Sequence, residues 1–100
     1  MKRSLIVYTN NSGSYIQRLI DSILEQMTED DELIIVDDLS QDETIPIIVG
    51  EVGYNWEDEE HYKLYINTSI KGKKASIEMA KKIATGDFKY IINKRKRIKL

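Results

Sequence analysis

Four short apolar segments alternate with three amphipathic segments along the 100 residues of this chain. The apolar segments, whose length and flanking turn residues favour strands, are residues 4–9, 33–36, 62–67 and 88–92. The amphipathic segments, with apolar residues at helical spacing, are residues 16–27, 45–52 and 71–84. Strands that alternate with helices predict a parallel sheet with right-handed crossovers. We therefore expect an α/β fold, a Rossmann-like three-layer sandwich with a four-stranded, mostly parallel sheet.

The composition excludes several classes of protein. The absence of Cys excludes disulfides, thiolate nucleophiles and Cys-ligated metals. His61 is the only histidine, so neither a His-rich metal site nor a catalytic triad can be argued. Hydrophobic residues make up 41% of the chain, enough for one core. The apolar runs are too short for a membrane span and no secretion signal opens the sequence, so we expect a cytoplasmic domain.

Turn and capping residues indicate where the helices begin and end. Ser12 or Ser14 is expected to cap the first helix. Pro46 is tolerated only in a first turn, which places the start of the second helix near Asp42 or Thr44. Glycines are expected to end the second and third helices, at positions 53 and 86.

The charges are distributed unevenly. Residues 94–100 carry five basic side chains and no acidic one, a net charge of +5. The remaining 93 residues carry ten basic and 17 acidic side chains, a net charge of −7. We treat residues 94–100 as a basic C-terminal tail, which either contacts a polyanion or is a solvated, frayed end. The tail has no interleaved aromatic residues, so nucleic acid is not an expected partner.

Polar residues follow each of the four predicted strands. In parallel α/β sheets, ligands bind outside the carboxyl ends of the strands. The residues expected at that edge are 8–11, 37–38, 67–74 and 93–95. These four clusters are therefore the candidate site.

Several segments resemble glycosyltransferases of family 2. Leu5–Ile16 is similar to the family's first strand and turn, and Ser22–Gln26 to the end of its first helix. Glu32–Thr44 is similar to the family's Glu-Leu-Ile-Ile-Val-Asp-Asp-Gly-Ser-x-Asp-x-Thr, and Ala84–Phe88 to its Ala-x-Gly-Glu-Tyr. The resemblance implies that residues 1–93 are the nucleotide-binding half of a GT-A domain, with strand order 3-2-1-4.

The resemblance also implies a UDP or UDP-sugar ligand. In the family, the turn after the first strand and the second Asp of the Asp-Asp pair hold the nucleotide base; by position these are Tyr8, Asn10 and Asp38. A carboxylate there can accept the imide N–H of uracil. Asp37 is expected to serve the connection after the strand, and Leu39 stands where the family has Gly. The alternative for the Asp pair is a solvated strand end with a capping role.

The sequence departs from the family where a divalent cation would bind. The family has Asp-x-Asp after the fourth strand, and its carboxylates hold Mg²⁺ or Mn²⁺ on the sugar diphosphate. This chain has Asn93, Lys94 and Arg95 there, so we expect no metal ligand and no cofactor. Lys94 and Arg95 are instead possible diphosphate contacts, and Lys73 lies on the same predicted rim.

The resemblance ends before the acceptor-binding half, whose catalytic base would lie beyond Leu100. We therefore assign no catalytic residue and expect a truncated or degenerate half domain that is not catalytic alone. The alternative is a small non-enzymatic interaction module that binds polyanions or a partner through its basic tail. A response-regulator receiver domain requires an Asp after a later strand, where Asn67 and Asn93 stand. An incompletely covered sheet at residues 88–92 predicts self-association or a covering partner.

Overall fold

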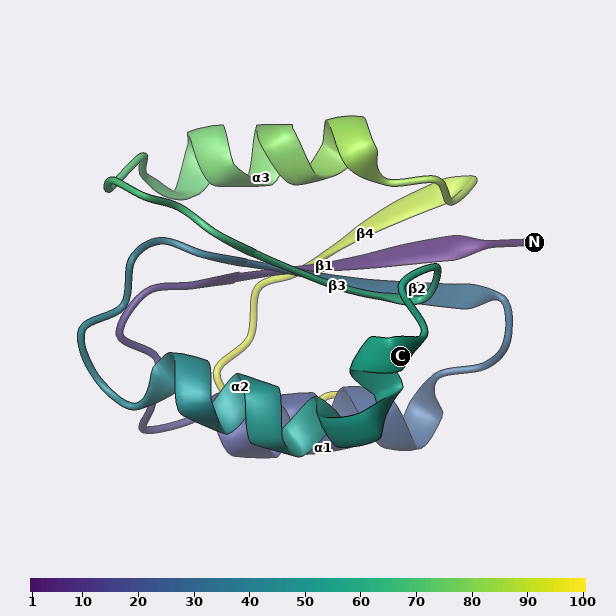
Figure 1. Cartoon of the computed structure of the whole chain (residues 1–100). Coiled ribbons are helices and arrows are strands. Elements are labelled where there is room, and N and C mark those ends of the chain that lie inside the picture. The colour runs from purple at the N-terminus through teal and green to yellow at the C-terminus, as the bar shows by residue number, and fades with distance from the viewer.

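The computed structural model describes residues 1–100, which form one sheet with helices on both faces (Figure 1). The strands are β1 (Arg3–Thr9), β2 (Asp31–Asp37), β3 (Tyr62–Ile66) and β4 (Phe88–Ile92). The helices are α1 (Ile16–Gln26), α2 (Thr44–Val52), the short 3₁₀ helix η1 (Gly53–Glu57) and α3 (Lys73–Ile83). The predicted alternation of strands and helices is confirmed.

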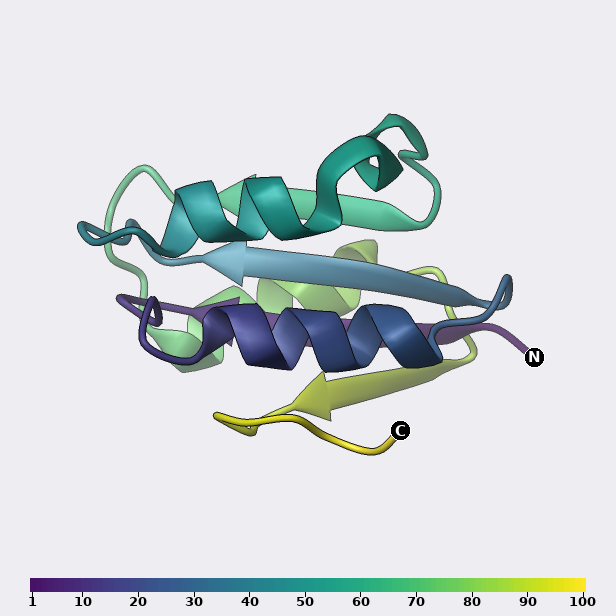
Figure 2. The ribbon, with the colours of Figure 1, turned by 90° about the horizontal axis from the view of Figure 1, so that it is seen from below.

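The sheet has the order β3-β2-β1-β4, and every neighbouring pair of strands is parallel. Leu5 of β1 lies beside Leu33 of β2 on one side and Tyr90 of β4 on the other. Helices α1 and α2 cover one face and α3 covers the opposite face (Figures 1 and 2). The expected three-layer sandwich is therefore confirmed, with an all-parallel sheet.

Side chains of the two central strands alternate between two apolar layers, as the pleat of a strand requires. Leu5, Val7, Leu33 and Ile35 pack with α1 and α2 in the larger layer. Ile6, Ile34 and Val36 pack with Ala80 of α3 in the smaller layer. Both faces of β1 and β2 are therefore buried, which explains why their sequences are continuously apolar.

The predicted starts and ends of the helices are confirmed only in part. Gly53 ends α2 with a φ of +59°, as expected. The predicted serine cap of α1 is wrong: this helix begins after Tyr15 with no side-chain cap, and the Ser12 carbonyl accepts from the Tyr15 and Ile16 N–H groups. The α3 helix starts at Lys73, two residues later than predicted.

Gly86 has a packing role and does not end α3. That helix ends at Ile83, with Ala84 as its C-cap. Gly86 passes so close to β1 that a Cβ would lie 2.5 Å from Ser4 Oγ and 2.7 Å from Ser4 N. Its N–H donates to Ser4 Oγ at 2.8 Å. Only glycine allows this approach, which brings β4 beside β1.

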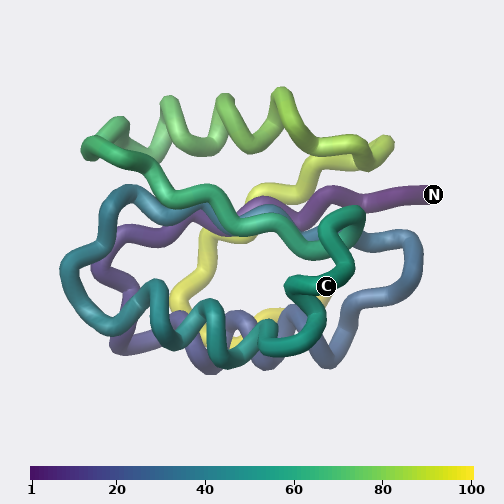
Figure 3. Tube along the Cα trace, viewed as in Figure 1, coloured from purple at the N-terminus to yellow at the C-terminus, as the bar shows by residue number.

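The basic tail, residues 94–100, does not fray. After β4 the chain turns into the layer of α1 and α2 and runs back along α1 (Figures 2 and 3). Ile98 and Leu100 pack against the larger apolar layer, and Ile98 N–H donates to Ser22 Oγ. The expectation of a frayed end is therefore wrong for the main chain of residues 98–100, while the five basic side chains are exposed. All helices of the structure are too short or too polar to cross a membrane.

Candidate functional site

A recess of about 250 Å³ lies at the carboxyl ends of β1 and β4. Five of the six residues predicted for nucleotide or diphosphate binding line this recess, and they are Tyr8, Asn10, Lys73, Lys94 and Arg95. Its apolar lining comes from Val7, Leu19 and Ile92. Three of the lining residues are cations and none is a carboxylate, so the recess attracts anions.

Asp38, the sixth predicted residue, is fully buried beside the recess. One carboxylate oxygen accepts from Tyr8 Oη (2.7 Å) and the Gly72 N–H (2.9 Å). The other accepts from Asn67 Nδ2 (3.0 Å) and the Lys71 N–H (2.9 Å). Burial raises the pKa of Asp38, but these hydrogen bonds outweigh burial and hold the pKa at about 2. Base binding by Asp38 stays a prediction, and it requires one of these donors to move.

Tyr8 and Asn10 are tied to Asp38. Burial raises the pKa of Tyr8 to about 12, and donation of its hydroxyl to the Asp38 carboxylate adds to the shift. The side-chain amide of Asn10 donates from Nδ2 to the Asp38 carbonyl at 2.7 Å. Asn10 is exposed at the rim of the recess. These bonds fix Tyr8, near the end of β1, and Asn10, in the turn that follows.

Asp37 serves the connection after β2, as expected. Its Oδ1 accepts from Thr9 Oγ1 (2.7 Å) and Ser40 Oγ (2.6 Å), and its Oδ2 accepts from the Ser40 N–H (2.8 Å). Leu39, which stands where the similar family has Gly, has a backbone φ of +55°. A positive φ is strained for a leucine. The hydrogen bonds between Asp37 and Ser40, on either side of Leu39, hold the turn in place.

The cations of the recess come from two elements. Lys73 opens α3, and its Nζ donates to Asn93 Oδ1 at the end of β4. The Arg95 guanidinium lies over the Tyr15 ring, 5.6 Å from its centroid, within the range of a cation–π contact. Tyr15 also lines the recess, and the sequence reasoning missed it. Its position in the polar turn before α1 was the available signal.

The residues after β4 do not fit a divalent cation. The end of β4 presents an amide, an ammonium and a guanidinium in place of carboxylates. The amide oxygen of Asn93 already accepts from the Lys73 ammonium, so this oxygen is paired with a cation of the protein itself. No step through a metal is therefore derived for this site.

The strand order, the all-parallel sheet and the position of the recess define a Rossmann-like α/β domain with a site at the carboxyl ends of its strands, and its structural neighbours are GT-A glycosyltransferases. Crystal structures of TarS from S. aureus share this fold: one is 30% identical, has a TM-score of 0.72 and covers 92% of this chain. Residues 4–93 match the family model described as "Glycosyl transferase family 2". The chain therefore belongs to glycosyl transferase family 2.

Other relatives agree with this assignment. The O-antigen chain rhamnosyltransferase RfbN of Salmonella typhimurium (strain LT2) is 43% identical over 47 residues, which are 47% of this chain and 15% of that protein. The mannosyltransferase PcManGT of Pyrobaculum calidifontis, in complex with GDP-Man and Mn²⁺, is 26% identical with a TM-score of 0.74 over 86% of this chain. This chain covers 25% of that structure and 27% of the S. aureus TarS structure.

Proposed function

We propose that the chain binds the diphosphate of a nucleotide sugar, UDP or a UDP-sugar, in the recess at the ends of β1 and β4. The observation that carries this proposal is the presence of three cations and no carboxylate in the recess. Two solved structures of one relative, S. aureus TarS in complex with UDP and with UDP-GlcNAc, support the choice of ligand. The proposed activity is binding, since no catalytic residue is assigned.

The three cations take the part that a divalent cation plays on a diphosphate. Lys94 and Arg95 contact the diphosphate from the end of β4, and Lys73 contacts it from the start of α3. The base lies against Tyr8 at the end of β1 and Asn10 in the turn that follows. Binding by these groups requires no metal, in contrast to binding through an Asp-x-Asp pair.

Calorimetry with UDP and uridine, each with and without Mn²⁺, tests the proposal. We expect UDP to bind more tightly than uridine, with equal affinity in both buffers and weaker binding as salt rises. Changing Lys94→Ala and Arg95→Ala together removes two charge-assisted contacts of about 1.5–3 kcal/mol each and should abolish the preference for UDP. The matched control is Lys82→Ala with Lys89→Ala, two exposed lysines outside the recess.

Three outcomes contradict the proposal. No UDP binding at millimolar concentration indicates a degenerate domain without a ligand site. An affinity that requires Mn²⁺ indicates a cation site elsewhere. A loss of affinity in the Lys82 and Lys89 control equal to that in the recess variant indicates a nonspecific charge effect.

The second candidate function is an interaction module that binds polyanions through the basic tail. All five basic side chains of residues 94–100 are exposed, which favours this candidate. If this candidate is right, heparin displaces UDP as effectively as UDP-GlcNAc does, and changing Tyr15→Ala does not alter UDP binding.

We also propose that the open part of the sheet at β4 associates with a second copy or a partner.

A further inference from the structure

Two side chains of α1 hold the main chain of residues 98–100. Ser22 Oγ accepts from the Ile98 N–H at 3.0 Å. The Gln26 amide spans Lys99: its Nε2 donates to the Ile98 carbonyl at 2.7 Å, and its Oε1 accepts from the Leu100 N–H at 2.7 Å. These bonds join positions at least 72 residues apart in the chain. We call Ser22 and Gln26 the α1 latch.

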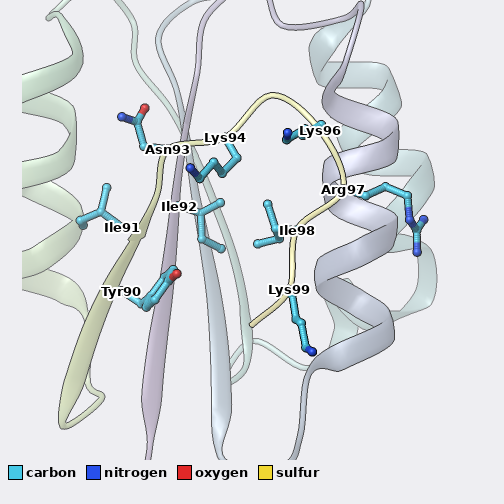
Figure 4. Close-up of a pocket in the computed structure, with 9 residues that line it drawn as sticks. All are labelled: Tyr90, Ile91, Ile92, Asn93, Lys94, Lys96, Arg97, Ile98 and Lys99. Carbon is cyan, nitrogen blue, oxygen red and sulfur yellow. The ribbon is translucent and has the colours of Figure 1, made fainter.

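The latch holds a segment that does not pack closely on the strand it leaves. A hollow of about 390 Å³ lies between β4 and residues 94–99. Figure 4 shows Ile98 directed toward Ile92 across this hollow and Arg97 lying over α1, where Arg97 pairs with Glu25. The Arg97–Glu25 pair is exposed and contributes little. The latch and the apolar contacts of Ile98 and Leu100 therefore keep the segment on α1.

The other end of the segment is fixed by the sheet, since Ile92 pairs with Val7 of β1. Residues 93–97 thus form a short loop held at both ends, and Lys94 and Arg95 lie on it in the recess. Both cations line the recess together with Lys73 and no carboxylate lines it, so the three positive charges repel one another. If residues 93–97 were held only at the β4 end, this repulsion would move Lys94 and Arg95 away from Lys73.

We propose that Ser22 and Gln26 are positioning residues that hold Lys94 and Arg95 ready for a diphosphate. This inference rests on the proposed function. A loop already ordered before binding loses little conformational entropy when the anion arrives, which strengthens binding. Neither Ser22 nor Gln26 lines the recess. Their effect is on the diphosphate alone, because the base lies against the turn after β1.

The first arm of the test measures the latch without any ligand. Gln26→Met keeps the length of the side chain but cannot bracket the main chain, and Ser22→Ala removes the third bond. The matched control is Gln17→Met, an exposed glutamine near the opposite end of α1. Trypsin cleaves after the five basic residues of the segment. In the double variant we expect cleavage after Lys96 and Arg97 to become about tenfold faster, with cleavage of residues 1–93 unchanged.

The second arm measures affinity by calorimetry in the same variants. The double latch variant should bind UDP about tenfold more weakly, with unchanged affinity for uridine and unchanged affinity of the Gln17→Met control for both. Faster tail cleavage with unchanged UDP affinity overturns the positioning role. Unchanged tail cleavage overturns the latch itself. A wild-type chain that binds no UDP overturns the proposed function and the positioning role together, while the trypsin arm still decides whether the latch exists.

Discussion

Asp38 connects three separate parts of the chain at one buried point. Its carboxylate accepts from Tyr8 in β1, from Asn67 after β3 and from the N–H groups of Lys71 and Gly72 before α3. The residue was predicted as a ligand contact, and its observed bonds give it a structural role at the same strand end. Because Lys71 and Gly72 bind Asp38, α3 begins only at Lys73.

Replacing Asp38 by alanine should destabilise the fold. The change removes the acceptor of the buried Asn67 amide and of the partly buried Lys71 and Gly72 N–H groups, so we expect the free energy of unfolding to fall by about 2–4 kcal/mol. Urea unfolding followed by circular dichroism measures the change. The control is Asp30→Ala at an exposed position, where the effect should stay within about 0.5 kcal/mol. An Asp38→Ala protein as stable as the control contradicts the structural role.

Buried carboxylates lie at both ends of β2, Asp31 and Glu32 at its start and Asp37 and Asp38 at its end. Glu32, near its start, accepts from Lys63 Nζ (2.6 Å), Ser4 Oγ (2.5 Å) and the Thr85 N–H (2.6 Å). Burial raises the pKa of Glu32, but these bonds outweigh burial and lower the pKa to about 2. Asp38, directly after the strand, has a similar pKa. The hydrogen bonds of Glu32 and Asp38 to neighbouring segments therefore favour the ionised form.

The stability of the fold should accordingly fall in acid. Each folded pKa, about 2, lies below its ordinary value of 4.5 or 3.8. The contribution of each group is therefore present above its ordinary pKa and is lost as the pH falls toward 2. We expect the free energy of unfolding to be level between pH 7 and 5 and to fall by a few kcal/mol, on the order of 2–5, by pH 2.

Urea titrations at several pH values measure this profile. Glutamine carries no charge, so the Glu32→Gln variant should be less stable than the wild type at pH 7. Because it has no carboxylate to protonate at position 32, it should also lose less stability between pH 4.5 and 2. The exposed Glu59→Gln is the control and should follow the wild-type profile. A Glu32→Gln profile as steep as that of the wild type contradicts the assignment.

At the scale of the whole molecule, the sheet has an uncovered part beside β4. Phe88 is 58% exposed and Tyr90 is 48% exposed, whereas Ile92 is buried under the tail. Exposed aromatic residues on an edge strand favour association. We therefore expect self-association at high concentration, and Phe88→Ser with Tyr90→Ser should yield a monomer.

Light scattering over a concentration series measures the association. Tyr54→Ser is the control, because Tyr54 is 92% exposed but lies on η1, away from β4. A monomeric wild-type chain at millimolar concentration contradicts the expectation, as does association that survives the double change at β4.

Much of the fold could be predicted because its signals are local. Leu33–Val36 is an apolar run of strand length, and the spacing of Ile16 to Met27 is helical over three turns. The strand order came from the resemblance to the family. Element ends were less accurate because distant groups set them, as Asp38 does for the start of α3.

Most of the site residues chosen from the sequence line the recess, but only part of how they are arranged could be predicted. The parallel topology places Tyr8, Asn10 and Asn93 at one edge of the sheet, which follows from the pattern of strands alone. The burial of Asp38 could not be predicted, since its donors come from a loop with no local signal. The docking of the tail was missed because five charges surround Ile98 and Leu100, and their partners on α1 lie more than 70 residues earlier.

The position of β1 between β2 and β4 has a consequence for folding. The main-chain bond from Asp87 N–H to the Lys2 carbonyl, 2.8 Å long, joins residues near the two ends of the chain. Of the four strands, β1 is synthesised first, but its neighbour β4 is synthesised last. Closing so long a loop costs entropy before the contacts of β4 compensate for it. The larger apolar layer is therefore completed late, and the chain should fold more slowly than a helical bundle of equal length.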